Sequence, residues 1–147
     1  MKTISYGVII VEDFGDIPHL LMCHSTNNTF WDVPKGGGDP EELPINAAIR
    51  ELFEETGFIV TADELLDIGV FDYNPHKNLH LFKYIGNNKF ITNKAICNSF
   101  FECTRTKKTF PEVDDFQFIP FEKVSSYCAK SFKSVFQKLQ GLLKPLV

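Results

Sequence analysis

The stretch from residue 36 to residue 58, GGGDPEELPINAAIRELFEETGF, constrains the fold of this 147-residue chain more than any other. It begins with three glycines, whose backbone can approach another group closely because no side chain intervenes. Pro44 suits the first position of a helix, and Gly57 suits the left-handed residue that ends one. Leu43 would be a poor N-cap, since it has no side-chain oxygen. The pattern therefore predicts a helix that begins near Pro44 and ends at Gly57.

Three glutamates of this helix, Glu51, Glu54 and Glu55, fall within one arc at about 100° per residue. Like charges so close together repel one another unless a cation lies between them. Carboxylate oxygens are the ligands that Mg²⁺ and Mn²⁺ prefer, so the arc predicts a divalent-metal site. The residues predicted on the other side of the helix are Ile45, Ala48, Ile49, Leu52, Phe53 and Thr56.

The residues around this acidic arc complete a candidate site. Glu42 can fold back over the start of the helix, and Arg50 can brace a carboxylate through a bidentate pair. Lys35 supplies a positive charge that suits phosphate, beside Gly36 and Gly37, where a metal or a phosphate can approach the backbone. Any single glutamate here is usually a solvated helix residue. The agreement of glycines, spacing and charge favours a functional site.

The rest of the chain predicts strands and a second helix. Runs rich in β-branched and aromatic residues predict strands at residues 4–11, 19–24, 69–73, 79–85, 99–104 and 116–121, with a polar loop at 86–98. From Glu122 onwards, apolar spacings of three and four predict a helix with a core-facing stripe. Its members are Val124, Tyr127, Cys128, Phe132, Val135, Phe136, Leu139, Leu142 and Leu143. Strands flanked by helices predict an α/β fold, and the length predicts one domain over residues 1–147.

Composition excludes several classes of protein. An apolar fraction of 44% and a charged fraction of 23% are typical of a globular domain. No apolar run approaches the roughly 20 residues that cross a bilayer, so we expect no membrane association and no secretory signal. The four cysteines form no C-x-x-C pair, and they predict reduced, mostly buried thiols in a cytoplasmic protein. They are Cys23, Cys97, Cys103 and Cys128.

The net charge of −4 is distributed unevenly along the chain. Residues 1–82 carry a net charge of −10, whereas residues 83–108 carry +5 and residues 121–147 carry five lysines and one glutamate. The acidic balance argues against broad binding of duplex DNA. An acidic half joined to a basic half indicates a site where metals and anions meet. Taken alone, the lysines are more typical of a solvated face.

The stretch from residue 36 to residue 58 resembles the Nudix box, G-x5-E-x7-R-E-U-x-E-E-x-G-U, in which U is a bulky apolar residue. Every specified place is filled, by Gly36, Glu42, Arg50, Glu51, Leu52, Glu54, Glu55, Gly57 and Phe58. The resemblance implies an α/β/α sandwich, with a mixed β-sheet flanked by helices. It also implies metal-dependent hydrolysis of a nucleoside diphosphate linked to another moiety. It implies nothing about the oligomeric state.

The resemblance also assigns roles by position, with Mg²⁺ or Mn²⁺ as the implied cofactor. The residues that look like metal ligands are Lys35 (through its carbonyl), Glu51, Glu54 and Glu55. Glu51 is either a ligand or the base that activates water. Arg50 and Glu42 look like the pair that fixes the glycine loop to the helix.

A later acidic segment, residues 111–118, is similar to a stretch of bacterial RNA pyrophosphohydrolases and dinucleoside polyphosphate hydrolases. In this family, an acid just before a late strand often serves as a further metal ligand or base. Glu112 is the first candidate here and Asp115 the second. Phe118 stands where those relatives commonly carry tryptophan. A charged turn before a strand is the alternative interpretation.

Substrate contacts are predicted from the loops. Lys35, Gly36 and Gly37 are candidates to bind phosphate. The candidates to bind base or phosphate from a strand connection are Tyr73, His76, Lys77 and His80, although a turn with a chance histidine is the more common explanation. Phe30 and Trp31 either stack on a base or are buried.

The expected substrate is a nucleotide, namely a dinucleoside polyphosphate, a (deoxy)nucleoside triphosphate or an RNA 5′ end. The alternative function is a catalytically idle Nudix-fold sensor that binds a nucleotide and regulates a partner. Such relatives typically lose box carboxylates, and all of them are present here. A pure protein-interaction module would leave the acidic arc unexplained.

Overall fold

A computed structural model of the chain describes residues 2–143. The strands are β1 (Thr3–Ile9), β2 (Val11–Phe14), β3 (Ile17–Ser25), β4 (Trp31–Asp32), β5 (Lys35–Gly37), β6 (Leu65–Asn74), β7 (Lys77–Tyr84), β8 (Phe100–Glu102), β9 (Thr109–Pro111) and β10 (Val113–Pro120). The helices are α1 (Pro44–Thr56), α2 (Phe121–Tyr127) and α3 (Lys130–Leu143), with 3₁₀ turns at Ala62–Glu64 and Thr92–Lys94.

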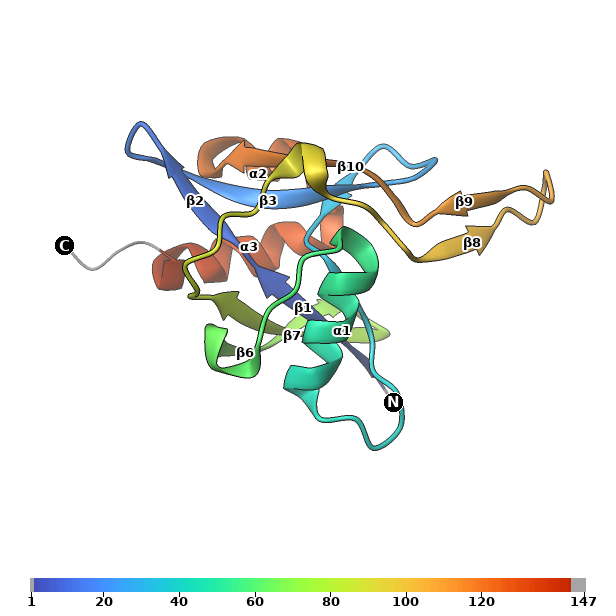
Figure 1. The fold of residues 1–147 in the computed structure, drawn as a ribbon, viewed down its shortest axis with the longest axis horizontal. Coiled ribbons are helices and arrows are strands. Elements are labelled where there is room, and N and C mark those ends of the chain that lie inside the picture. The colour runs from blue at the N-terminus through green and yellow to red at the C-terminus, as the bar shows by residue number, and fades with distance from the viewer. Residues whose placement is uncertain (1, 144–147) are drawn as a thin grey trace.

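Two sheets form the middle of the molecule (Figure 1). The first has the order β5-β1-β7-β6, and it is mixed because β1 runs parallel to β7 but antiparallel to β5. The second has the order β10-β3-β2, is antiparallel, and carries β4 beside β3. The strands β8 and β9 form a separate hairpin that projects from the body.

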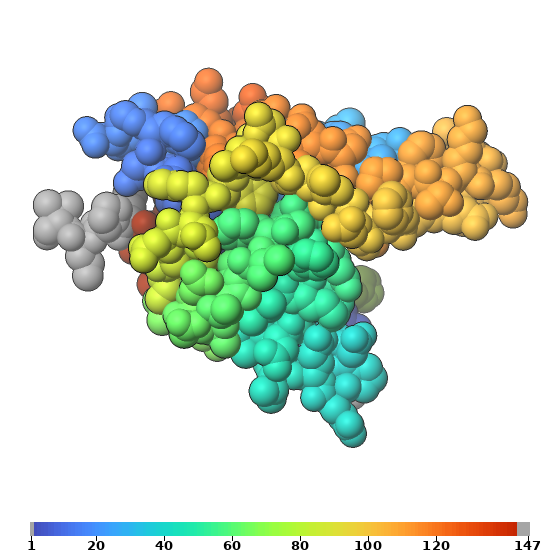
Figure 2. Space-filling model, viewed as in Figure 1, coloured from blue at the N-terminus to red at the C-terminus, as the bar shows by residue number. Residues whose placement is uncertain are grey.

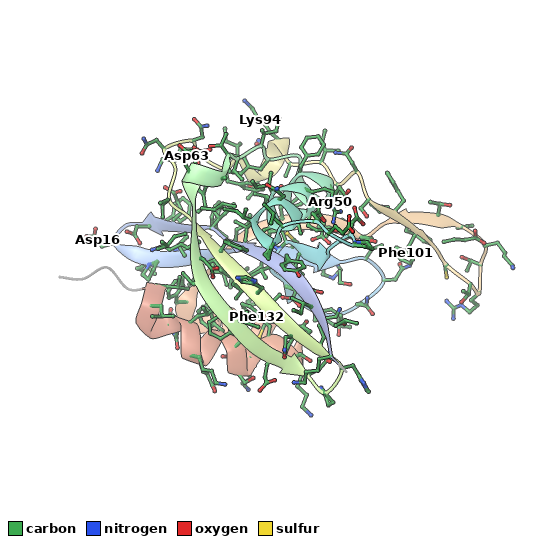
Figure 3. All side chains as sticks on the ribbon, turned by 90° about the horizontal axis from the view of Figure 1, so that it is seen from below. Asp16, Arg50, Asp63, Lys94, Phe101 and Phe132 are labelled. Atoms are coloured by element: carbon green, nitrogen blue, oxygen red, sulfur yellow. The ribbon has the colours of Figure 1, made fainter. Side chains whose placement is uncertain are left out.

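Helices cover both sides of the central strands. Ile9 of β1 and Leu20 and Met22 of β3 pack into the cluster that includes α2 and α3, whereas Val8 and Leu21 pack into the cluster that includes α1. Successive side chains in a strand point to opposite faces, so these two strands are buried on both. In Figure 3, Phe132 of α3 and Arg50 of α1 lie on opposite sides of the strands. The predicted α/β/α sandwich is confirmed.

The helix α1 begins and ends where the sequence predicts. It starts at Pro44, Leu43 makes no side-chain cap, and Gly57 ends it with a φ of 79° and an N–H donated to the carbonyl of Phe53. The prediction that Phe53 lies on the packing side is wrong, because its side chain is exposed. The strand β5 packs over the acidic arc of the helix. The buried residues of α1 therefore include Ala47, Glu51 and Glu55.

The C-terminal helix is two helices rather than one. The N–H of Ala129 donates to the carbonyl of Trp31 at 2.9 Å, and Cys128 adopts an extended conformation that pairs with Trp31. This contact with β4 interrupts the helix. The prediction that Tyr127 and Leu142 belong to the core stripe is wrong, since both are exposed.

Other boundaries also differ from the prediction. The strand β6 begins at Leu65 rather than at residue 69, and the predicted strand at 99–104 is one half of the β8–β9 hairpin. The loop at 86–98 contains a 3₁₀ turn. All four cysteines are free thiols, of which Cys23 and Cys97 are buried and the other two are half-buried. Within residues 2–143, no helix combines the length and the apolarity that a membrane crossing requires.

Candidate active site

The glycine loop is docked directly on the acidic arc of α1. Glu51 and Glu55 are 8% and 7% exposed. A Cβ added at Gly36 would lie 1.9 Å from Oε2 of Glu51, so any other residue there would displace that carboxylate. The backbone N–H of Lys35 donates to Oε1 of Glu55 at 3.1 Å. The contact between loop and helix thus buries two carboxylates at one place.

The guanidinium of Arg50 joins the loop to the helix. Its Nε and Nη2 donate to the two carboxylate oxygens of Glu42, each at 3.0 Å, which is the bidentate geometry that the sequence predicts. Nη2 also donates to the carbonyl of Gly37 at 2.8 Å. Nη1 donates to Glu51 at 2.8 Å and to both oxygens of Glu54 at 3.2 Å. One side chain therefore holds three carboxylates and the loop backbone.

The buried carboxylates have raised pKa values. Burial raises the pKa of Glu51, against the opposing hydrogen bond from Arg50. Burial also raises the pKa of Glu55, to about 8, although Lys35 opposes the shift. The charge of Glu112 raises both pKa values further, which shows that this residue lies near the arc. Burial thus disfavours the ionised form of both carboxylates, and a bound cation would favour that form.

The donors of this arc suit a divalent cation, but they are not arranged around one in this conformation. Within residues 2–143, no group of three or more histidine, cysteine, aspartate or glutamate side chains is positioned to hold a metal ion. The guanidinium of Arg50 instead lies against Glu51 and Glu54. Carboxylate and peptide oxygens are nonetheless the donors that Mg²⁺ and Mn²⁺ prefer, so the residues fit such an ion by their chemistry.

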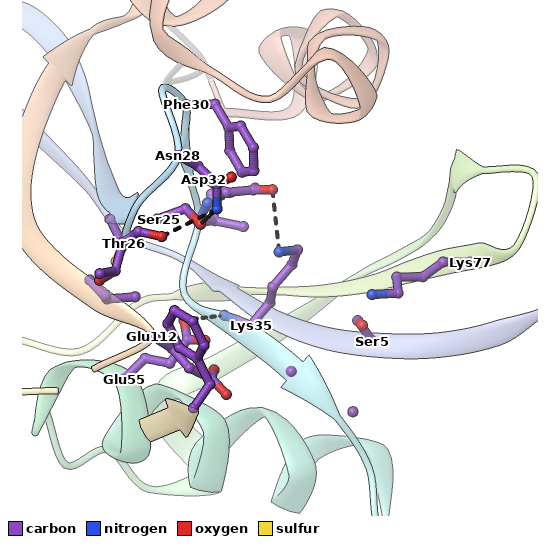
Figure 4. A pocket seen from close by; sticks show the side chains of 16 residues that line it. Ser5, Ser25, Thr26, Asn28, Phe30, Asp32, Lys35, Glu55, Lys77 and Glu112 are labelled. Carbon is purple, nitrogen blue, oxygen red and sulfur yellow. Dashed lines mark hydrogen bonds and ion pairs between the residues drawn. The ribbon is translucent and has the colours of Figure 1, made fainter. Parts of the chain in front are cut away.

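A cavity of about 450 Å³ opens beside the acidic arc (Figure 4). The predicted site residues that line it are Lys35, Gly36, Gly37, Glu55, Lys77 and Glu112. Those that lie outside its lining are Glu42, Arg50, Glu51, Glu54, Tyr73 and His76. The structure therefore brings the loop, the helix and the late acid to one cavity, with the Arg50 network behind its wall.

Lys35 is held in the cavity wall by two residues. Its Nζ lies 3.2 Å from Oδ2 of Asp32 and 5.4 Å from the ring centroid of Tyr73. The hydroxyl of Tyr73 donates to the same Oδ2 at 2.5 Å. Burial opposes the charge of Lys35, but Asp32 and Tyr73 outweigh it and raise the pKa of the ammonium. The hydroxyl predicted to contact the substrate is therefore already engaged by a buried carboxylate.

Of the remaining candidates, some line the cavity and others do not. Lys77 lines the cavity, whereas His76, its neighbour in the β6–β7 connection, accepts the backbone N–H of Thr3 with its carbonyl at 3.0 Å. Glu112 lines the cavity, whereas Asp115 lies in β10 and accepts the N–H of Phe116 at 2.8 Å. Glu112 therefore stays the first candidate and Asp115 the second.

Several cavity residues carry no signal in the sequence. They are Ser25, Thr26, Asn28, Asp32 and Phe101. Asp32 follows Trp31 in a two-residue strand, and nothing in that local pattern marks it as a partner for Tyr73, 41 positions further on. Of the two aromatic candidates, Phe30 lines the cavity, while the ring of Trp31 packs edge-on against His24.

An α/β/α sandwich in which a glycine loop docks on a glutamate-bearing helix defines the class of protein. The chain belongs to the NUDIX domain family, which matches residues 1–138. It is 36% identical over 127 residues to an uncharacterised 17.7 kDa protein of the e-segB intergenic region of Enterobacteria phage T4, covering 82% of this chain and 83% of that one.

Shorter matches connect the chain to characterised relatives. It is 39% identical over 66 residues to human diphosphoinositol polyphosphate phosphohydrolase 3-beta, covering 45% of this chain and 39% of that protein. It is 43% identical over 54 residues to the m7GpppN-mRNA hydrolase dcap-2 of Caenorhabditis elegans, covering 37% of this chain and 7% of that protein. The chain thus spans well under half the length of these two relatives.

Solved structures share the fold at low identity. The NUDIX domain of Shewanella oneidensis NrtR, complexed with ADP-ribose, superposes with a TM-score of 0.71 at 12% identity, covering 98% of this chain and 90% of that one. The Caenorhabditis elegans Ap4A hydrolase superposes with a TM-score of 0.65 at 17% identity, covering 96% and 97%. The family match, together with the phosphohydrolase among the curated relatives, confirms the prediction of a pyrophosphohydrolase.

Proposed function

We propose that the protein is a divalent-metal-dependent pyrophosphohydrolase that cleaves a nucleoside diphosphate linked to another moiety. The candidate substrates are a dinucleoside polyphosphate, a (deoxy)nucleoside triphosphate and an RNA 5′ end. The observation that carries the proposal is the pair of buried carboxylates, Glu51 and Glu55, docked against the Lys35–Gly37 loop at a cavity. On a surface helix without a binding or catalytic role, the same carboxylates would be exposed to solvent.

We propose that the metal is Mg²⁺ or Mn²⁺. Its ligands would be the carboxylates of Glu51, Glu54, Glu55 and Glu112 and the carbonyl of Lys35. When bound, the ion supplies positive charge that stabilises the pyrophosphate group during cleavage. Glu51 and Glu54 would exchange their hydrogen bonds with Arg50 for the ion, while Arg50 keeps its bidentate pair with Glu42. A related fold, from Francisella tularensis, is described as complexed with AMP and Mn ion, which supports this choice.

Each remaining residue of the site has its own task. The ammonium groups of Lys35 and Lys77 bind phosphate oxygens at the cavity wall. Gly36 and Gly37 let those oxygens approach the backbone. Glu51 or Glu112 takes the proton of the attacking water, which requires the carboxylate to be ionised. Tyr73 and His76 stay predictions as direct substrate contacts.

The cavity favours a nucleotide over an inositol polyphosphate. Of the described residues that line it, only Lys35 and Lys77 are basic, and Asp32 already neutralises the first. An inositol ring that carries many phosphates would need more cations around it. Phe30 and Phe101 instead offer aromatic surface, on which a base stacks favourably. The alternative of an idle sensor finds no support in the site, since every box carboxylate is retained.

The test is hydrolysis of a substrate panel by the purified chain with Mg²⁺ or Mn²⁺. Nucleoside triphosphates, diadenosine polyphosphates, 5′-triphosphorylated RNA and a diphosphoinositol polyphosphate are incubated separately, and the products are resolved by ion-exchange chromatography. We expect cleavage of at least one nucleotide, its loss in EDTA, and its loss in Glu51→Gln. Glu122→Gln, at an exposed position in α2, is the matched control. No turnover of any nucleotide with either metal would overturn the proposal.

We also propose that the chain is a single domain over residues 1–147 and works in the cytoplasm. The four free thiols suit a reducing compartment.

A further inference from the structure

The β8–β9 hairpin stands apart from the rest of the described fold. Its strands pair only with each other in the sheet topology, and the hairpin projects away from both sheets (Figures 1 and 2). A two-stranded hairpin on its own is marginally stable in water. Pairing with either sheet therefore does not stabilise the hairpin, and its side chains are candidates for a role other than packing.

The base of the hairpin is a wall of the cavity. Phe101 lines the cavity, and so do Glu112 and Val113, which directly follow β9. Phe101 faces Phe110 across the two strands, with 6.0 Å between the ring centroids. A substrate that leaves the cavity on this side passes along this aromatic pair.

The tip of the hairpin carries three cations. Hydrogen bonds between Cys103 and Lys108 and between Lys107 and Cys103, each at 2.8 Å, close the turn. Arg105, Lys107 and Lys108 are exposed, and none of them forms an ion pair within residues 2–143. Lys108 directly precedes β9 and lies two positions before Phe110. The hairpin therefore offers aromatic rings at its base and positive charge at its tip.

We propose that this hairpin binds the single-stranded polynucleotide of a substrate whose 5′ polyphosphate is cleaved in the cavity. The inference rests on the proposed function and selects among its candidate substrates. Aromatic platforms combined with cations are the general means of binding single strands, because stacking holds the bases while the cations hold the phosphates. Arg105 lies four positions beyond Phe101, at most about 13 Å along an extended chain. A nucleoside triphosphate held in the cavity has no phosphate at that distance, whereas a polynucleotide has one on every nucleotide.

The first measurement is the salt dependence of binding. A 3′-labelled ten-nucleotide RNA with a 5′ triphosphate is titrated with protein in EDTA, and fluorescence anisotropy gives Kd at 50 and 200 mM salt. If each of the three cations contacts one phosphate, the slope of log Kd against log salt should be about 2 units steeper for wild type than for a variant that lacks them. Over this range of salt, that difference is roughly an 18-fold greater loss of affinity. Removing the three cations should remove that excess.

The variants isolate the hairpin from the general charge. The test variant combines Arg105→Ala, Lys107→Asn and Lys108→Ala, with asparagine chosen because Lys107 has a φ of 62°. The matched control removes the same charge from exposed positions on α2 and α3, with Lys123→Ala, Lys133→Ala and Lys138→Ala. Circular dichroism and the melting temperature check that both remain folded.

Kinetics then separate this inference from the proposed function. We expect kcat/KM for the ten-nucleotide RNA to fall about tenfold in the test variant, while kcat/KM for ATP changes less than twofold. The same oligonucleotide made as DNA shows whether the hairpin accepts any single strand. Equal salt slopes for wild type, test and control variants would overturn the role of the hairpin. Absence of turnover with ATP, with RNA and with dinucleotides would instead overturn the proposed function.

Discussion

Replacing Tyr73 with phenylalanine tests whether its hydroxyl serves Asp32 rather than the substrate. The ring, and with it the contact to Lys35, is retained, so the change removes one hydrogen bond of 2.5 Å to a buried carboxylate. Oδ2 of Asp32 then keeps only the ammonium at 3.2 Å, while Oδ1 keeps the N–H of Val33 at 2.8 Å. Hydrogen bonds to charged groups contribute roughly 1.5–3 kcal/mol, so we expect a loss of about 2 kcal/mol in the free energy of unfolding.

Urea denaturation gives the measurement. The single tryptophan, Trp31, adjoins Asp32 and reports the local transition, and circular dichroism reports the global one. For a chain of this length, a loss of about 2 kcal/mol lowers the melting temperature by roughly 4–8 °C. Tyr127→Phe is the control, because that side chain is exposed and should change stability by less than about 0.5 kcal/mol. Equal stabilities for the two variants would refute the reasoning.

Three further predictions concern the acidic arc. Glu51→Gln should lower kcat by about 10²–10⁴ while the fold survives, and turnover close to wild type would remove Glu51 from the chemistry. Gly36→Ala should lower activity by about 10²-fold, because its Cβ would lie 1.9 Å from Oε2 of Glu51 and displace that carboxylate; an unchanged rate would show that the loop yields freely. In EDTA, stability should fall as pH rises from 5 to 8, by up to about 1.4 kcal/mol per pH unit, because the pKa of Glu55 is raised to about 8 and the folded state therefore binds the proton more tightly than the unfolded state. Urea denaturation at four pH values should show this slope in wild type and a flatter one in Glu55→Gln.

Local chemistry made α1 and its site predictable from the sequence. Pro44 presets the start of the helix and Gly57 its end, and both signals act within a single turn. The spacing of Glu51, Glu54 and Glu55 places them on one arc in any α-helix, whatever surrounds it. The bidentate pair between Arg50 and Glu42 is also a local contact, since the two residues lie only eight positions apart in the chain.

Contacts between distant segments decided what the sequence left open. The apolar spacing after Glu122 is compatible with one long helix, and only the hydrogen bond from Ala129 to the carbonyl of Trp31 divides it. Equally, the strand predicted at 69–73 says nothing of a partner for Tyr73, and only the fold brings its hydroxyl to Asp32.

The cavity itself is tertiary in origin. Its walls come from β1, β3, the β3–β4 turn, β4, β5, α1, β7, β8 and the segment after β9. The periodicity of apolar residues indicates which face of a helix or strand is buried, but it does not indicate which distant helix or strand packs on that face. The sequence therefore determined the helix α1, with its acidic arc and the class of chemistry that the family carries, whereas packing between segments determined the cavity.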